Sequence, residues 1–468
     1  MVFSMGIMPQ DAYYFFYSEH LSLSYFDHPP GVAIMLWAFI HILGSEVWGL
    51  KLIDFLVTGA SLVVIYYLSR QFLSKSRSLN VLFILGSTLL ITDVSIVTTP
   101  DVPLLLFWTL SLLLMYRAIR SGRIREWVFA GLTTGIAFDC KYTALYLPLA
   151  LIFYLILARK DRRYIFSLQL ATFIISFIAV ILPVILWNVD HDFASFRFQS
   201  GDRMSSILEF KLRPVYFFAT IGHQMLLLLP FLAMVIGVVF WKHVKRGWNS
   251  KALPDESTLF LLCMSMPMII AFLMISWIYW VKINWLIPAY TAAAILAIRY
   301  MSGRSMKMQM WTAVVFNGLL LAQIAWYPVN IQSDDTYWGW KTLAREVASL
   351  KERFPDSFVF SADSYKTTAI LNYYLDETVY AGNVIGLHAL EYSITDADLS
   401  HLHGRNALFI DSRPMVRSFD QEHNPREVLN VYFDELIIQS PITLYDRRGR
   451  ALRQFAVVEC RNYRPVSN

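Results

Sequence analysis

Positive charge is missing from the start of the chain, and charge of either sign is scarce throughout it. The first fifty residues contain no lysine or arginine, and only 16% of the 468 residues are charged, against about 25% in a soluble domain. Hydrophobic residues make up 56% of the chain and concentrate before residue 330, in segments long enough to cross a bilayer core of about 30 Å. These proportions exclude an ordinary soluble protein and predict a polytopic helical membrane protein.

Cysteine is scarce too, and two common kinds of site are therefore not indicated. The chain has 3 cysteines and no CxxC spacing, so neither a zinc site nor a disulfide framework is predicted. It has no glycine-rich loop of the kind that cradles nucleotide phosphates. The net charge of +5 comes without a basic block, so nucleic acid is not predicted as a partner.

Apolar segments alternate with short polar loops through the first two thirds of the chain. Ten segments are predicted to span the membrane: 48–69, 79–97, 102–118, 127–140, 143–158, 164–187, 213–241, 257–279, 283–300 and 309–328. Every second loop is rich in lysine and arginine, at 70–77, 117–125, 159–163, 242–251 and 299–307. The positive-inside rule makes these loops cytoplasmic. The other loops, the first fifty residues and the tail after 330 are then predicted to lie outside the cytoplasm, in an inner (cell) membrane.

Residues 31–44 are apolar but too short to span, so they predict an interfacial or re-entrant helix. An external first loop also needs something to carry it across the membrane. We therefore expect one further span to precede Met1, the alternative being a short tail that crosses unaided. The predicted division is an external first loop at 1–47, a helical membrane domain at 48–328 and an extracytoplasmic α/β domain at 329–468.

The tail has the pattern of a mixed α/β domain. Buried strands are predicted at Phe358–Ala362 and Ala407–Asp411, and a helix at Tyr365–Leu375. Further strands are predicted at Leu436–Tyr445 and Arg453–Cys460. The tail is long enough to form its own core.

Ionisable residues collect in the loops that are predicted to be external, and such groups at membrane depth usually mark a site or pathway. The candidates are Asp11, Asp27, His28, Asp101, Lys141, Arg203, Lys282 and Asn284. Each also has an ordinary structural explanation. The aspartates suit helix caps or a turn before proline, and the cations suit interfacial anchors. Because the charges lie on one face and few lie near the midplane, an enzyme at the membrane surface is favoured over a transporter.

Five sequence blocks carry a family resemblance. In chain order they are DAYYFFYSEHLSLSYFDHPPGVA (11–33), TPDVPLLLFW (99–108), GIAFDCKYTALYLP (135–148), WNVDHDFASFRFQSGDR (187–203) and KINWLIPAY (282–290). The chain resembles the bacterial members of the dolichyl-phosphate-mannose–protein mannosyltransferase-like family, which are C-type membrane glycosyltransferases distantly related to the lipid A aminoarabinose transferases. The family normally has Asp-Glu at the start of the first loop, whereas this chain has Gln10-Asp11.

The resemblance implies a glycosyltransferase that moves a sugar from a polyprenyl-phosphate carrier to a lipid, glycan or protein acceptor of the cell envelope. It implies an acidic catalytic base at the start of the first loop. Since Gln10 replaces the usual first acid, either Asp11 takes the role with a one-residue shift or the base is elsewhere. Our first choice is Asp11 and our second is Asp101. The external cations Lys141, Arg203 and Lys282 are the candidates for binding the donor phosphate. Asp27, His28 and Asn284 are the candidates for binding the sugar or acceptor.

No cofactor is predicted. Asp11, Asp27, His28 and Asp101 include ligands that suit a divalent metal ion, but sequence spacing does not establish that they converge. Two other functions remain open. One is a transporter or flippase for lipid-linked sugars, and the other is an inactive scaffold, which Gln10 favours.

Overall fold

The computed structural model describes residues 5–202, 211–250, 253–331, 333–414 and 425–465. These residues form two compact units. The helical unit comprises residues 23–44 and 51–321, and the mixed unit comprises residues 1–22, 45–50 and 322–468. Two of the four boundaries between the units, at 50/51 and 321/322, fall inside the long helices α3 and α17. The predicted division at 47/48 and 328/329 concerns the membrane and stays a prediction.

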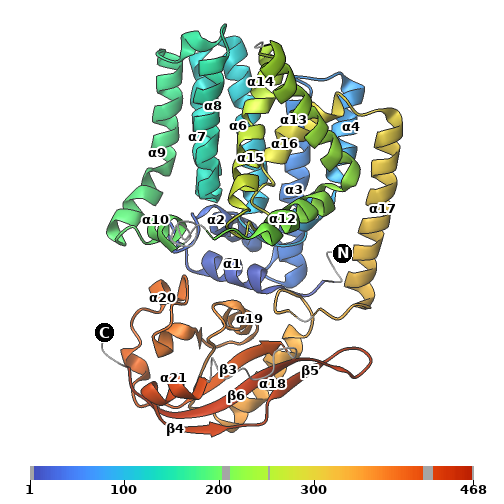
Figure 1. The fold of residues 1–468 in the computed structure, drawn as a ribbon. Helices are drawn as coiled ribbons and strands as arrows, with labels where there is room; N and C mark the ends of the chain where they lie inside the picture. Colours follow the sequence, from blue (N-terminus) through green and yellow to red (C-terminus); the bar gives the residue numbers. More distant parts are fainter. Residues whose placement is uncertain (1–4, 203–210, 251–252, 332, 415–424, 466–468) are drawn as a thin grey trace. The chain divides into compact units, whose positions relative to one another are not determined.

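The helical unit consists of apolar helices (Figure 1). They are α2 (Gly31–Leu43), α3 (Val47–Ser69), α4 (Lys75–Gly86), α5 (Leu89–Val94), α6 (Asp101–Ser121), α7 (Ile124–Cys140), α8 (Tyr146–Leu157), α9 (Leu168–Asp190), α10 (Ala194–Arg197), α12 (Pro214–Leu228), α13 (Pro230–Ser250), α14 (Glu256–Cys263), α15 (Met266–Ile275), α16 (Ala289–Ile298) and α17 (Gly303–Trp326). Among the described residues, 5 helices are long and apolar enough to cross a membrane, or up to 6 if a bent pair counts as one span. The predicted helical membrane domain is confirmed at this level, and the count of ten spans stays a prediction.

Three predicted spans are each divided between two α-helices: 79–97, 213–241, and 257–279, which comprises α14 and α15. Segment 79–97 breaks after Gly86, and the Thr88 side chain begins α5 by accepting a hydrogen bond from the backbone N–H of Ile91 at 3.4 Å. Segment 213–241 bends by 116° between α12 and α13. At the bend, Leu229 has a φ of 64° and the next residue is Pro230, whose ring cannot continue the preceding helix.

Two glycines let α7 pack closely against α9, and these helices run side by side in Figure 1. A Cβ atom on Gly131 would lie 2.9 Å from the Cβ of Ser176, and one on Gly135 would lie 2.5 Å from the Cβ of Val180. Small residues four apart allow this backbone approach in apolar helix pairs, where van der Waals packing drives association. The close packing fixes α7, whose end carries Lys141.

The mixed unit contains a six-stranded sheet with strand order β2-β1-β3-β6-β4, and β5 pairs with β6. The strands are β1 (Phe358–Phe360), β2 (Val379–Tyr380), β3 (Ala407–Pro414), β4 (Phe433–Ile438), β5 (Ile442–Tyr445) and β6 (Ala451–Tyr463). β1 is parallel to β2 and β3, and β6 is antiparallel to its neighbours. The unit's helices are α1 (Pro9–Glu19), α18 (Trp340–Arg353), α19 (Lys366–Tyr374), α20 (Tyr392–Thr395) and α21 (Pro425–Tyr432).

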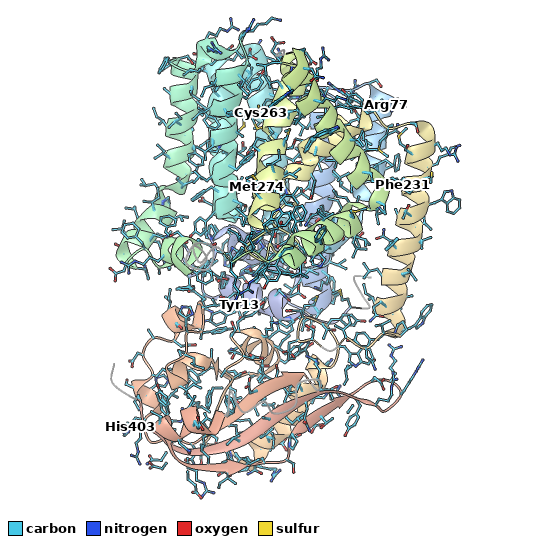
Figure 2. All side chains as sticks on the ribbon, viewed as in Figure 1. Tyr13, Arg77, Phe231, Cys263, Met274 and His403 are labelled. Carbon is cyan, nitrogen blue, oxygen red and sulfur yellow. The ribbon has the colours of Figure 1, made fainter. Side chains whose placement is uncertain are left out.

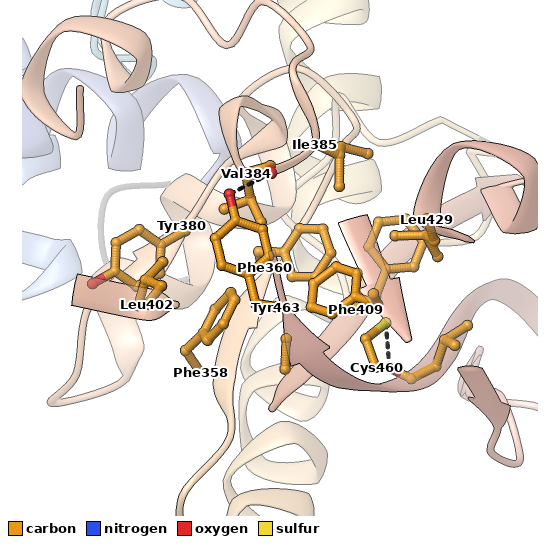
Figure 3. Close-up of a cluster of buried hydrophobic side chains, with 13 residues drawn as sticks. Phe358, Phe360, Tyr380, Val384, Ile385, Leu402, Phe409, Leu429, Cys460 and Tyr463 are labelled. Atoms are coloured by element: carbon orange, nitrogen blue, oxygen red, sulfur yellow. Dashed lines mark hydrogen bonds between the residues drawn. The ribbon is translucent and has the colours of Figure 1, made fainter. Parts of the chain in front are cut away.

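The core of this sheet is aromatic (Figure 3). Phe360 lies with its ring centroid 5.0 Å from that of Phe409 and 5.8 Å from that of Phe433, and all three side chains are buried. The tail therefore has a core of its own, as its length predicted. One strand prediction was wrong in its extent: Leu436–Tyr445 is two strands, because Pro441 interrupts the segment and has no N–H to give to a ladder.

Candidate functional site

Three of the predicted site residues meet in the helical unit. The Lys141 ammonium lies 2.8 Å from both carboxylate oxygens of Asp101, and the Asn284 side-chain amide donates to Asp101 Oδ2 at 2.5 Å. Asp101 is 1% exposed and Lys141 is 6% exposed. The ion pair is therefore removed from water. In such a buried environment an ionic hydrogen bond is stronger, but an unpaired charge is costly.

Local structure explains this placement. Asp101 is the first residue of α6, directly after Pro100, where a carboxylate suits the positive end of the helix. Lys141 follows the last residue of α7, and its extended backbone (φ −160°, ψ 134°) turns the chain out of that helix. Asn284 lies in the turns that precede α16. Helix ends thus deliver the three side chains to one place.

The YFDHPP turn is held by the block at 194–202. Its backbone closes with the N–H of Tyr25 donating to the carbonyl of His28 at 3.1 Å. Ser195 Oγ donates to the carbonyl of Tyr25 at 2.7 Å, and Gln199 Nε2 donates to the carbonyl of Asp27 at 2.7 Å. The side chains of Asp27 and His28 lie 3.8 Å apart, within ion-pair distance when the histidine is protonated. Ser195 and Gln199 are positioning residues that the sequence did not single out.

A hydrogen bond links this turn to the segment that carries the ion pair. The hydroxyl groups of Ser24 and Tyr142 lie 3.2 Å apart, and Tyr142 directly follows Lys141. Asp27 is 8% exposed, as expected for a polar group of a site rather than a free loop. The structure therefore connects the first-loop block with the FDCKYT block through side-chain contacts.

Two further predicted cations have different outcomes. Lys282 is exposed and lies two residues before Asn284. Arg203 lies outside the described residues.

Asp54 on α3 is a buried acid that was not predicted as a site residue. It accepts a hydrogen bond at 2.7 Å from the Oγ1 of Thr98, and Thr98 lies three residues before Asp101. Its charge within an apolar segment was the available signal.

The close approach of α2 to the end of α7 depends on a glycine. A Cβ on Gly31 would lie 2.7 Å from the Asp139 carbonyl oxygen, 2.7 Å from Cys140 Cα and 2.8 Å from Cys140 Sγ. We expect Gly31→Ala to lower the free energy of unfolding by about 1–3 kcal/mol, because backbone atoms must separate to admit the methyl group. Thermal unfolding of the purified protein measures this.

The matched control is Gly59→Ala on α3, where a Cβ meets nothing within 4 Å. There alanine is expected to be neutral or stabilising, since it lowers the entropic cost of ordering a helix. Equal melting temperatures for the two alanine variants would show that the α2–α7 contact does not constrain this region.

In the mixed unit, Asp11 lies in the first turn of α1 and is fully buried. Its Oδ2 accepts the backbone N–H of Met8 at 2.7 Å. Asp11 is therefore not the N-cap, as its structural alternative had it, but the third residue of α1, whose carboxylate bonds back to the N-cap Met8. The catalytic assignment stays a prediction. The aromatic side chains that follow Asp11 pack on the tail: Tyr13 (labelled in Figure 2) lies 4.6 Å from Tyr365, ring centroid to ring centroid, and Phe16 lies 4.5 Å from Tyr392.

The residue before Asp11 is tied to an acid of the tail. Gln10 Nε2 donates to Asp335 Oδ1 at 3.0 Å, and Lys366 Nζ donates to Asp335 Oδ2 at 3.0 Å. Asp335 therefore bridges the first turn of α1 and the first residue of α19. A carboxylate from the tail thus lies beside the position where the family resemblance expects an acid in the first loop itself.

Asp335→Ala is expected to lower kcat about tenfold while the donor KM stays within about twofold, because α1 loses an anchor next to Asp11 without losing a binding group. The melting temperature should barely change, since half-exposed ion pairs contribute only about 0–1 kcal/mol. Steady-state kinetics with a lipid-linked sugar measure the split. Asp376→Ala, which removes an exposed acid after α19, is the control and should behave as wild type. A rise in KM with unchanged kcat would contradict the positioning role.

Within the described ranges, no three histidine, cysteine, aspartate or glutamate side chains are arranged to hold a metal ion. We therefore assign no metal ligands.

Comparison with known proteins supports the family resemblance seen in the sequence. The sequence profile described as dolichyl-phosphate-mannose-protein mannosyltransferase matches residues 27–187, which include Asp27 and His28 of the YFDHPP turn, Asp101 and Lys141. The fold matches the crystal structure of ArnT from Cupriavidus metallidurans in the apo state with a TM-score of 0.61, over 97% of this chain and 93% of that one, at 14% identity. The chain is therefore similar to the C-type membrane glycosyltransferases in sequence over residues 27–187 and has the fold of ArnT. The resemblance recognised in the sequence is thereby confirmed.

Two curated proteins that this chain is similar to have names that indicate sugar transfer. It is 25% identical to the lipid A galacturonosyltransferase RgtD of Rhizobium johnstonii, over 62% of this chain and 59% of that protein. It is 26% identical to the putative mannosyltransferase YkcB of Bacillus subtilis, over 39% of this chain and 26% of that protein. The chain thus spans less than two thirds of either relative. ArnT has also been crystallised with undecaprenyl phosphate, and that form matches with a TM-score of 0.60.

Proposed function

We propose that this protein transfers a sugar from a polyprenyl-phosphate carrier to a lipid, glycan or protein acceptor of the cell envelope, on the non-cytoplasmic face of the inner membrane. The observation that carries the proposal is the buried Asp101–Lys141–Asn284 cluster at the ends of apolar helices. A charged group held at such a place suits a lipid substrate whose phosphate head is polar and whose tail is apolar. The names of the relatives support the same reaction class.

The reaction forms a bond between the acceptor oxygen and the anomeric carbon, and it breaks the bond between that carbon and the phosphate oxygen. The acceptor hydroxyl is a weak nucleophile, so a carboxylate that takes its proton raises the rate. Asp11 is the proposed base and Asp101 is the second choice. The lipid phosphate leaves with added negative charge, which cations stabilise. Lys141, Arg203 and Lys282 are proposed for this role, and Asp27, His28 and Asn284 are proposed to bind the sugar.

The Asp101–Lys141 contact refines these roles. Asp101 holds both of its oxygens against the lysine, so it is better placed to orient Lys141 than to accept a proton from an acceptor. A donor phosphate would then share the Lys141 ammonium with Asp101, and the Asn284 amide would keep the carboxylate fixed. This arrangement favours Asp11 as the base.

Mass spectrometry of envelope glycans from a deletion strain tests the function. One sugar should disappear from one class of lipid, glycan or protein and return on complementation. The purified protein should also transfer a labelled sugar from a polyprenyl phosphate. Movement of the labelled lipid-linked sugar across liposomes without chemical change would instead establish a flippase. Binding of polyprenyl phosphate without turnover on any envelope acceptor would support a scaffold.

A further inference from the structure

An apolar groove lies in the helical unit between α2, α3, α6 and α7. It has a volume of about 510 Å³, which is in the range of small-molecule sites, and its lining is apolar except for Asp139. Ile34 on α2 is 51% exposed and Leu56 on α3 is 46% exposed, so the groove opens along the surface of these helices. Such a groove suits an apolar chain that enters from the bilayer.

The one charged residue of the groove lacks a hydrogen-bond donor. Asp139 Oδ1 is inaccessible to solvent, and no described residue donates a hydrogen bond to it. A buried carboxylate oxygen without a donor is costly, and native structures keep few such atoms without a functional reason. The groove therefore combines an apolar lining with one carboxylate oxygen, Asp139 Oδ1, that receives no hydrogen bond from the described residues.

Two residues that line the groove are close in sequence to the proposed reaction site. Pro103 lines the groove on α6, two residues after Asp101, and Cys140 lines it on α7, directly before Lys141. A lipid in the groove would therefore have its polar end near the ion pair. The acceptor of the proposed reaction must bring a hydroxyl group to that place.

The chemistry of Asp139 selects between the two lipids of such a reaction. An isoprenoid chain has no hydrogen-bond donor to offer Asp139, whereas a hydroxyl group has one. A hydroxylated lipid fits both features, because its chain fills the apolar lining and its O–H donates to Asp139. We propose that this groove binds the acceptor, a lipid that carries a hydroxyl group, and that Asp139 selects it by accepting a hydrogen bond. The proposal rests on the proposed function and deepens it by naming the acceptor class.

The test uses the full chain in nanodiscs of phosphatidylcholine, whose head group has no hydroxyl or amine. The probes are a long-chain alcohol and its methyl ether, each with the same photoreactive group in the chain, and undecaprenyl phosphate. The wild type is expected to bind the alcohol about tenfold more tightly than the ether, as a hydrogen bond to a charged group implies. Crosslinks should map to α2, α3, α6 or α7.

Asp139→Leu is expected to bind the two probes equally and to keep the wild-type affinity for undecaprenyl phosphate. Asp139→Asn keeps an acceptor oxygen without the charge, so an intermediate preference is expected. Both variants should melt at or above the wild-type temperature, because the unpaired buried charge is removed. Ile136→Trp, which fills the groove, should weaken both probes alike.

The proposal is wrong if the wild type binds alcohol and ether equally, if Asp139→Leu keeps the preference, or if undecaprenyl phosphate displaces the alcohol from the groove. The last result would show that the groove binds the isoprenoid chain of the sugar donor instead. These binding experiments need no turnover. If the protein binds the alcohol more tightly than the ether but transfers no sugar, the proposed function is contradicted, while the hydroxyl-selective binding site is still supported.

Discussion

Asp11→Asn is expected to lower the rate of sugar transfer by about 10²–10⁴-fold, the usual contribution of a positioned general base. The change is nearly isosteric, and the asparagine oxygen can still accept the Met8 N–H that Asp11 Oδ2 now accepts at 2.7 Å. The fold of α1 should therefore survive. The measurement is transfer of labelled sugar from a polyprenyl phosphate by purified protein, at matched expression and melting temperature.

A pair of further variants separates chemistry from helix capping. Asp11→Ala removes the cap as well as the charge and should be about 1 kcal/mol less stable than Asp11→Asn, with the same loss of rate. Asp398→Asn changes an exposed aspartate of the same unit and should retain full activity. Full activity in Asp11→Asn would remove this residue as the base and direct attention to Asp101.

The sequence predicted which side chains would be polar in apolar surroundings, but it did not predict how they would pair. Asp101, Lys141 and Asn284 were each candidates because they interrupt apolar segments at predicted external ends. Their contacts join residues 40 and 183 positions apart, and no local pattern reports such pairing. The structure therefore shows Asp101 as the partner of a lysine, and its role as second-choice base stays a prediction.

Hydrogen bonds from side chains to backbone carbonyl groups could not be predicted from the sequence either, for a different reason. Ser195 and Gln199 hold the YFDHPP turn through the carbonyl groups of Tyr25 and Asp27, and every residue has a carbonyl. The block that contains them was recognised only as part of a family resemblance. Its role in holding the turn needed coordinates.

Hydropathy located the apolar segments well but did not show where they break. Segment 79–97 is predominantly apolar on both sides of the break before Thr88, and segment 213–241 is apolar across the bend at Leu229. Proline was the usable signal in two places, at Pro230 in the helical unit and Pro441 in the sheet. At Thr88 the signal is a helix-capping residue type that occurs equally well within helices.

Lys141→Met is expected to lower the free energy of unfolding by about 3–5 kcal/mol, because it leaves the buried Asp101 carboxylate with no cation. Sugar transfer should be lost as well, since the proposed phosphate-binding ammonium is gone. Thermal unfolding in detergent and labelled-sugar transfer measure the two effects on the same preparation.

The double variant Asp101→Asn/Lys141→Met separates the two effects. With both charges removed, most of the lost stability should return, since an uncharged pair of similar volume is often as stable as a buried ion pair. Activity should not return, because neither of the substituted side chains supplies a cation for the phosphate. A double variant as unstable as Lys141→Met alone would show that the cost lies in packing rather than in the stranded charge. Activity in the stable double variant would exclude Lys141 from the phosphate site and leave Lys282 and Arg203 as its cations.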